Sequence, residues 1–119
     1  MRPESLKFLH DMREAARRVL EFTNRKTLAD FRTDILLRSA VERQFELIGE
    51  ALSPLSKIDR EAAERIPERR GIISFRNILI HSYTEIDEAL VWGVVESRLP
   101  QMLRTLDTIL EVIDLRDHD

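Results

Sequence analysis

The sequence contains no cysteine, which excludes a disulfide framework, thiolate catalysis and cysteine-ligated zinc. Glycine and proline are scarce, with three and four residues among 119, so few positions break a helix. No apolar run approaches the ~20 residues of a membrane span, and the first residues lack the apolar stretch of a signal peptide. We therefore expect a cytoplasmic protein without membrane contact.

Positive charge is not in excess either, because the formal net charge is −3. A protein with this balance does not hold nucleic acid by bulk charge, so any RNA contact requires a local basic patch. One candidate patch lies within a twelve-residue stretch and consists of Arg65, Arg69, Arg70 and Arg76. Arg69 and Arg70 are the predicted RNA contacts in this patch. The alternative interpretation is a set of solvated arginines paired with Glu64 and Glu68.

The residues that are abundant favour helices. Leu, Glu, Arg, Ala and Ile dominate, and apolar residues recur with the 3.6-residue period of an α-helix. The pattern predicts a single all-α domain over residues 1–119, an up-and-down bundle of four to five helices. The expected long and short helices cover residues 4–22, 33–52, 59–65, 71–81, 87–99 and 100–113. A further short helical segment is expected to start at residues 27–30. Ser53-Pro54 is expected to end the helix at 33–52, and Pro100 either opens the last helix or kinks one long helix.

The most informative segment is residues 76–83, which places four polar side chains in an apolar helical stretch. These side chains are Arg76, Asn77, His81 and Tyr83. A buried polar group needs a structural or chemical reason. Arginine with histidine is the minimum set for cleaving a phosphodiester without metal, because one stabilises charge on the phosphate and the other moves protons. The segment is therefore a candidate active site.

Helical geometry restricts how these residues can cooperate. Arg76 and Tyr83 lie roughly 20° apart on an ideal helix and share a face, whereas Arg76 and His81 lie roughly 140° apart. The two catalytic candidates can converge if the helix ends near His81 or if a second copy completes the site. A symmetric homodimer brings two copies of the segment to one axis. We therefore expect a homodimer whose partner copy contributes to the site.

The Arg-x4-His-x-Tyr pattern of Arg76, His81 and Tyr83 resembles the signature of HepT-type toxins of the HEPN superfamily. Other segments resemble the same family in the same order along essentially the whole chain. They are Val41-Glu42-Arg43, Ile48-Gly49-Glu50-Ala51, Ile66-Pro67, Arg76-Asn77, Val91-Trp92 and Leu99-Pro100.

The resemblance implies a ribonuclease toxin of a type VII-like toxin–antitoxin pair, an all-helical homodimer with its cleft between subunits. Carried onto this sequence, Arg76 and His81 are catalytic, with Asn77 as their polar neighbour. Tyr83 is the tyrosine to which the cognate antitoxin, a minimal nucleotidyltransferase, attaches AMP. The expected reaction is an attack by the RNA 2′-hydroxyl on the adjacent phosphate. It requires no metal or other cofactor.

Two other interpretations stay open. The chain is alternatively a non-catalytic helical subunit that only binds a nucleotidyltransferase. Glu42, Glu46 and Glu50 follow a four-residue spacing that is found in di-metal bundles, although the Glu-x-x-His pairs of such sites are absent from the sequence. These carboxylates are otherwise a solvated, dimer-facing or cleft-lining surface. Trp92 is expected to anchor the core, with base stacking as the alternative.

Overall fold

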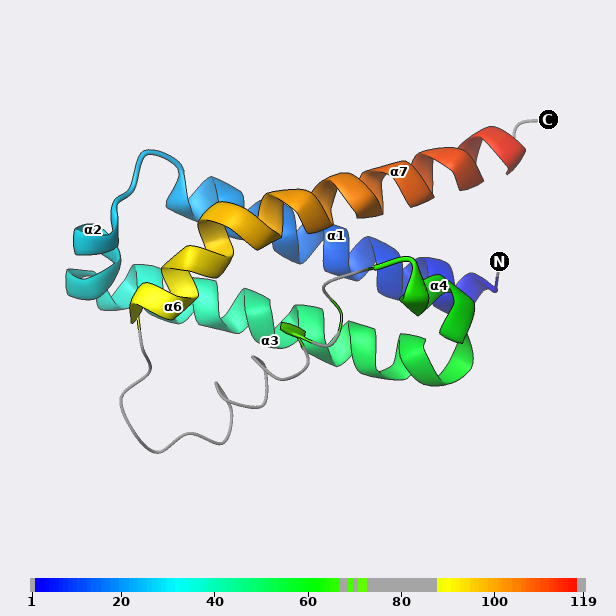
Figure 1. Cartoon of the computed structure of the whole chain (residues 1–119), viewed down its shortest axis with the longest axis horizontal. Helices are drawn as coiled ribbons and strands as arrows, with labels where there is room; N and C mark the ends of the chain where they lie inside the picture. The colour runs from blue at the N-terminus through cyan, green and yellow to red at the C-terminus, as the bar shows by residue number, and fades with distance from the viewer. Residues whose placement is uncertain (1, 67–68, 70, 73–87, 118–119) are drawn as a thin grey trace.

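The computed structural model describes residues 2–66, 69, 71–72 and 88–117, and for 114–117 only the backbone. Regular structure in this part of the chain is helical throughout and includes no strand, which confirms the predicted all-α fold. Long helices run side by side and shorter ones flank them (Figure 1). In chain order they are α1 (Pro3–Thr23), α2 (Leu28–Thr33), α3 (Ile35–Ile58), α4 (Arg60–Glu64), α6 (Glu88–Gly93), the π-helix η1 (Val94–Arg98) and α7 (Leu99–Asp117).

The frame of the molecule is the antiparallel pair of α1 and α3, and α7 runs across this pair (Figure 1). In α1 the buried side chains recur every three or four residues, at Leu9, Met12, Ala16 and Val19. This stripe is the one that the sequence predicted, and the observed helix differs from the predicted 4–22 by one residue at each end. Burying each large apolar side chain contributes about 1.5–3 kcal/mol, so the stripe fixes which face of α1 meets α3.

The short helix α2 starts where the sequence predicted, because its first residues form a capping box. The Thr27 hydroxyl accepts a hydrogen bond from the Asp30 backbone N–H at 3.2 Å, and the Asp30 carboxylate accepts one from the Thr27 N–H at 2.9 Å. Phe31 is fully buried, and its ring centroid lies 5.5 Å from that of Trp92 in α6. Trp92 is therefore a core anchor, as predicted.

The predicted end of α3 at Ser53-Pro54 is wrong, because the helix continues through Pro54 to Ile58. Proline has no N–H to donate to the carbonyl four residues earlier, which costs about 3 kcal/mol in a helix interior. The residues that follow compensate. Leu55 is fully buried, and its carbonyl accepts the Asp59 N–H at 2.9 Å. Burial of the last turn thus outweighs the local signal to stop.

The segments α6, η1 and α7 follow one another without a break, so Pro100 lies in the first turn of α7 within one long helical run. The π-turn is defined by a hydrogen bond from the Leu99 N–H to the Val94 carbonyl, five residues earlier. The Ser97 hydroxyl donates to the Gly93 carbonyl at 2.7 Å. The Ser97 side chain thus supplies a donor to the Gly93 carbonyl, which precedes the π-turn. Pro100, which follows the π-turn, has no N–H to donate.

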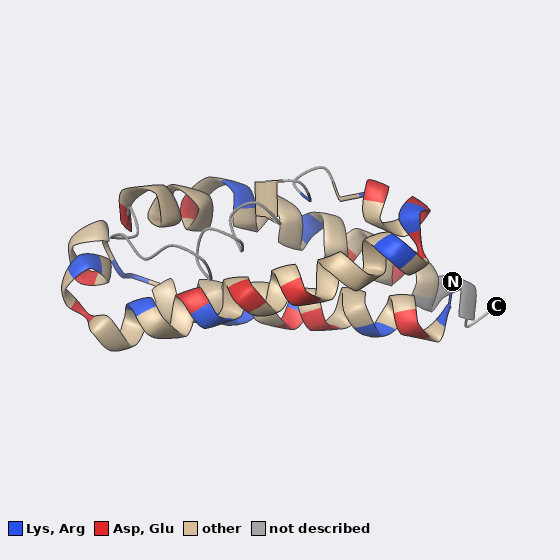
Figure 2. Cartoon of the chain, turned by 90° about the horizontal axis from the view of Figure 1, so that it is seen from below, with Lys and Arg blue, Asp and Glu red and all other residues tan. Residues whose placement is uncertain are grey.

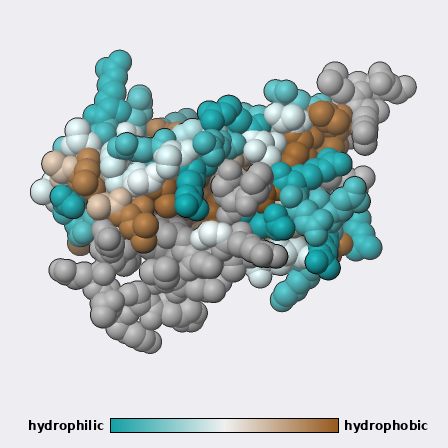
Figure 3. Space-filling model, in the orientation of Figure 1, coloured by the Kyte–Doolittle hydropathy of each residue, from teal (hydrophilic) through white to brown (hydrophobic). Residues whose placement is uncertain are grey.

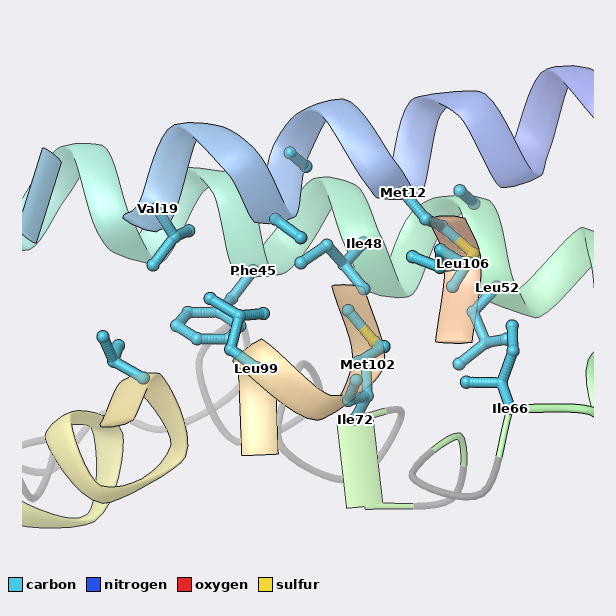
Figure 4. Packing of buried hydrophobic residues seen from close by; sticks show 14 of the residues in the cluster. Met12, Val19, Phe45, Ile48, Leu52, Ile66, Ile72, Leu99, Met102 and Leu106 are labelled. Carbon is cyan, nitrogen blue, oxygen red and sulfur yellow. The ribbon is translucent and has the colours of Figure 1, made fainter. Parts of the chain in front are cut away.

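The core lies between α1, α3 and α7 and includes the stretch that follows α4 (Figure 4). Figure 4 shows Phe45, Ile48 and Leu52 of α3 directed toward Leu99 and Met102 of α7. These side chains are 0–1% exposed. These side chains place the start of α7 against the middle of α3.

Candidate active site

The predicted catalytic segment lies between two well-anchored parts of the fold, but the segment itself is outside the described residues. The predicted site residues in that position are Arg70, Arg76, Asn77, His81 and Tyr83. Their proposed roles stay predictions. Arg69, the other predicted RNA contact, is described, as are the helical residues Gly71 and Ile72.

Two buried isoleucines hold the chain that enters this segment. Ile66 is 0% exposed and Ile72 is 6% exposed. Figure 4 shows Ile66 beside Leu52 of α3 and Ile72 beside Met102 of α7. Ile72, which precedes Arg76 by four positions in the sequence, is therefore packed into the core.

The helix α4 is tied to the start of α1, which fixes the approach further. Asp59 caps α4 by accepting the Ala62 N–H at 3.1 Å, and its other carboxylate oxygen accepts the hydroxyl of buried Ser5 at 2.9 Å. These hydrogen bonds, first that from Ala62 and then that from Ser5, lower the pKa of Asp59 below its usual value. The carboxylate is thus held ionised between two helices that are far apart in sequence.

The ion-pair interpretation of the arginines on this approach is wrong for Glu64, and Glu68 lies outside the described residues. Glu64 pairs with Arg60 at 3.0 Å and not with Arg65, whose side chain is exposed. Arg69 is half-buried and donates from Nη1 to the Ile66 carbonyl at 3.3 Å. Neither Arg65 nor Arg69 has a carboxylate within ion-pair distance among the described residues, so both retain positive charge for a ligand.

Sequence reasoning missed one arginine that lies beside this approach. Arg98, the last residue of η1, extends its guanidinium over Gly71, where an added Cβ would stand 3.3 Å from Nη1. No sequence signal links the two positions, because the π-turn and the packing of Ile72 bring them together. The basic residues described near the candidate site are therefore Arg65, Arg69 and Arg98.

Two of the three glutamates at four-residue spacing on α3, Glu46 and Glu50, pair with arginine. Arg43 Nη1 lies 3.1 Å from Glu46 and 3.6 Å from Glu50. Among the residues that the structure describes, no group of three His, Asp or Glu side chains is placed to hold a metal ion. The spacing on α3 thus serves a surface ion-pair network in these two cases.

Glu42 differs from the other two, because burial raises the pKa of its carboxyl. The nearby Arg38 opposes this rise, whereas the charges of Glu46 and Glu88 add to it. Glu88 is the first residue after the undescribed segment 73–87, so the half-buried Glu42 lies on the side of α3 where that segment ends.

An open groove of about 390 Å³ lies between α1 and α3. Its lining residues are Phe8, Asp11, Glu14, Arg18, Leu47, Glu50 and Ala51. Carboxylates outnumber the single arginine there, which opposes binding of a polyanion. The groove is therefore not a candidate RNA site.

The rest of the described surface mixes charge with isolated apolar areas. Figure 2 shows acidic and basic residues interspersed along the long helices. Large aliphatic side chains are exposed at Ile35 (70%) and Leu36 (77%), where α3 begins, and at Leu90 (53%) in α6. Figure 3 shows hydrophobic surface over the end of the molecule where α2 and α6 lie. The adjacent exposed side chains of Ile35 and Leu36 leave apolar surface that a contact with another protein would cover.

Among the helices described, none has the length and apolar character needed to cross a bilayer.

Comparison with known proteins identifies the chain's relatives. A family model described as "Ribonuclease HepT-like" matches residues 12–109. "Putative RNase MJ1380" of Methanocaldococcus jannaschii is 34% identical over 102 residues, which cover 86% of this chain and 93% of that protein. "Probable ribonuclease HepT" of Thermococcus cleftensis is 32% identical, over 80% of this chain and 86% of that protein. The chain also matches 51% of a longer Methanocaldococcus jannaschii protein, "Gamma-glutamylcyclotransferase and putative RNase MJ0434", at 34% identity. No solved structure matches significantly.

Proposed function

Because the chain belongs to the HepT-like ribonuclease family, we propose that it is an endoribonuclease and the toxin of a toxin–antitoxin pair. The observation that carries the proposal is the Arg76-x4-His81-x-Tyr83 pattern, which falls inside the matched residues 12–109. Arg76 and His81 are the proposed catalytic residues, and Asn77 is their polar neighbour. The uncompensated arginines on the approach to this segment support an RNA substrate.

The proposed reaction follows from the chemistry of these side chains. The His81 imidazole removes the proton from an RNA 2′-hydroxyl, and the resulting oxygen attacks the adjacent phosphorus. The bond from phosphorus to the 5′-oxygen breaks, and a histidine returns a proton to that oxygen. The planar guanidinium of Arg76 donates to the non-bridging oxygens, where negative charge develops. One product carries a 2′,3′-cyclic phosphate and the other a 5′-hydroxyl, and no metal takes part.

Digestion of RNA in the presence of a chelator, followed by end-group analysis, tests this reaction. We expect cyclic phosphate ends from the wild type, no product from His81→Ala or Arg76→Ala, and no cleavage of DNA, which lacks the 2′-hydroxyl. Strict dependence on magnesium would refute the mechanism. A wild type that binds a nucleotidyltransferase but never cleaves RNA would instead favour the non-catalytic subunit.

A homodimer is part of the proposal, because Arg76 and His81 diverge on an ideal helix. The exposed aliphatic residues Ile35, Leu36 and Leu90 support a protein contact, since burying them against a second copy removes apolar surface from water. Mixing inactive Arg76→Ala and His81→Ala proteins tests whether the site is shared. Recovery of activity in the mixture is expected if each subunit supplies one catalytic residue, and light scattering should give the dimer mass.

Tyr83 is the proposed position at which a cognate minimal nucleotidyltransferase attaches AMP. A bulky phosphate group there would lie on the face that an ideal helix shares with Arg76, so it would pair with that guanidinium and repel RNA phosphate. Co-expression with the nucleotidyltransferase and intact-mass spectrometry should show added AMP. Tyr83→Phe is the matched control: it has no hydroxyl to accept AMP at that position, so AMP still added to this variant would place the modification elsewhere and refute the assignment.

A further inference from the structure

Arg98 places a guanidinium beside the start of the segment that carries the proposed catalytic residues. An added Cβ at Gly71 would stand 3.3 Å from Arg98 Nη1, a distance at which one of the two groups has to move. Glycine therefore leaves the space that the guanidinium occupies. Ile72, the next residue, is 6% exposed and packs beside Met102 of α7, so the position of Gly71 is fixed by the core (Figure 4).

The backbone of the π-turn determines where Arg98 lies. The Leu99 N–H to Val94 carbonyl bond makes the turn one residue longer than an α-turn, and buried Leu99 and Val95 hold it on both sides. Arg98 itself is exposed. Its side chain thus projects into solvent from a backbone position that the core holds.

Arg98 also differs from the arginines that neutralise carboxylates on this surface. Arg13, Arg17, Arg43 and Arg60 each lie within ion-pair distance of an Asp or Glu side chain. Arg98 has no such partner among the described residues, and the same holds for Arg69, two residues before Gly71. On a chain of net charge −3, two uncompensated guanidinium groups on one approach make a local site for anions.

We propose that Arg98, together with Arg69, binds the phosphate backbone of the RNA strand next to the reaction site. The inference rests on the proposed ribonuclease function and extends it to residues outside the catalytic pattern. The exposed Arg98 guanidinium presents a planar fork of N–H donors that matches phosphate oxygens, and Arg69, whose Nη1 donates to the Ile66 carbonyl, adds its remaining N–H groups. Arg98 binds substrate and takes no part in proton transfer, so its loss should weaken binding and leave the chemical step intact.

Binding of a short single-stranded RNA with 2′-O-methyl riboses tests the proposal, because this probe cannot be cleaved by 2′-hydroxyl attack. Arg98→Gln keeps the length and polarity of the side chain and removes the charge. We expect the Kd to rise roughly ten-fold and the slope of log K against log salt to fall by about 0.7, the value for one lost single-strand phosphate contact. Arg98→Lys should retain the slope and lose only part of the affinity.

Two further variants separate charge from structure. Arg104→Gln removes the same charge from α7, six residues further along and roughly 120° around an ideal helix, and should bind like the wild type. Gly71→Ala keeps both charges and places a methyl group 3.3 Å from Nη1; the exposed Arg98 side chain can give by the small distance required, so binding should change less than in Arg98→Gln. Circular dichroism should show unchanged helicity in both, since neither residue is buried.

Steady-state cleavage distinguishes the possible outcomes. Arg98→Gln should raise KM about ten-fold and leave kcat within about two-fold of the wild type. A lower kcat with unchanged KM and salt slope means that Arg98 acts in the chemical step and not in substrate binding, and overturns the proposal. Unchanged binding and kinetics in a wild type that cleaves RNA overturn it as well and leave the ribonuclease intact. RNA binding that depends on Arg98 in a protein without cleavage supports the phosphate site and refutes the ribonuclease.

Discussion

Replacing Asp59 with alanine tests whether the approach to the catalytic segment is held by the bond between α4 and α1. The substitution removes the N-cap of α4, which accepts the Ala62 N–H at 3.1 Å, at a cost of about 1 kcal/mol. In the wild type the buried Ser5 hydroxyl donates to this carboxylate at 2.9 Å. The substitution leaves that hydroxyl without an acceptor, which costs about 1 kcal/mol more. We expect a loss of about 2 kcal/mol, or roughly 8 °C in Tm for a chain of this size.

A double-mutant cycle with Ser5→Ala measures the second contribution directly. Ser5→Ala alone should cost about 0.5 kcal/mol, because the Asp59 carboxylate keeps its hydrogen bond from the Ala62 N–H and is accessible to water. The double variant should lose about 1.5 kcal/mol, since no orphaned hydroxyl is left inside. Chemical denaturation should therefore give a coupling of about 1 kcal/mol. Additive losses, within about 0.3 kcal/mol, would refute the reasoning.

The pH dependence of the Asp59→Ala variant gives an independent check. The pKa of Asp59 is lower in the folded protein than in the unfolded chain, so its ionised form stabilises the fold above the unfolded value near pH 4. That contribution is lost as the pH falls through the folded pKa. The difference in unfolding free energy between wild type and Asp59→Ala should therefore shrink on acidification, and a constant difference would contradict the assignment.

Three further substitutions have expected effects on stability. Glu42→Gln should raise Tm at pH 7, because the raised pKa of Glu42 means that its charged form opposes folding; thermal scans should show the gain vanish below about pH 4. Arg25→Gly should stabilise by about 0.5–1 kcal/mol in denaturant titrations, because Arg25 has a φ of 61°, which disfavours any side chain. Pro54→Ala should stabilise by about 1–2 kcal/mol by the same measurement, since it restores an N–H to α3; a loss would show that Pro54 contributes packing.

Local signals in the sequence predicted the parts of the fold that local chemistry determines. The period of Leu9, Met12, Ala16 and Val19 predicted α1 to within one residue at each end. The prediction succeeded because the apolar side chains that pack into the core all lie on one face of the helix. The start of α2 followed from the Thr27 capping box, which acts within four residues. The family resemblance agreed with the all-α architecture and with the family that the comparisons identified.

Contacts between distant residues were not predictable in the same way. Pro54 is a local signal to stop, but the burial of Leu55 depends on the rest of the core and overrides it. The Ser5–Asp59 bond joins residues 54 positions apart, and nothing in either local sequence indicates the partner. The approach of Arg98 to Gly71 likewise requires the π-turn and the packing of α7. The assignments of Arg76, Asn77, His81 and Tyr83 rest on the sequence pattern and stay predictions.

The π-turn at Val94–Arg98 has a consequence for how this part of the chain tolerates insertions and deletions. A π-turn contains one residue more than the α-turn it replaces, which corresponds to roughly 100° of helical rotation. Deleting one residue there would restore an uninterrupted α-helix. If α7 kept its place, Trp92 would turn away from Phe31; if Trp92 kept its place, the buried face of α7 would turn away from the core. Relatives with a one-residue gap in this stretch should therefore carry compensating changes at the aromatic pair.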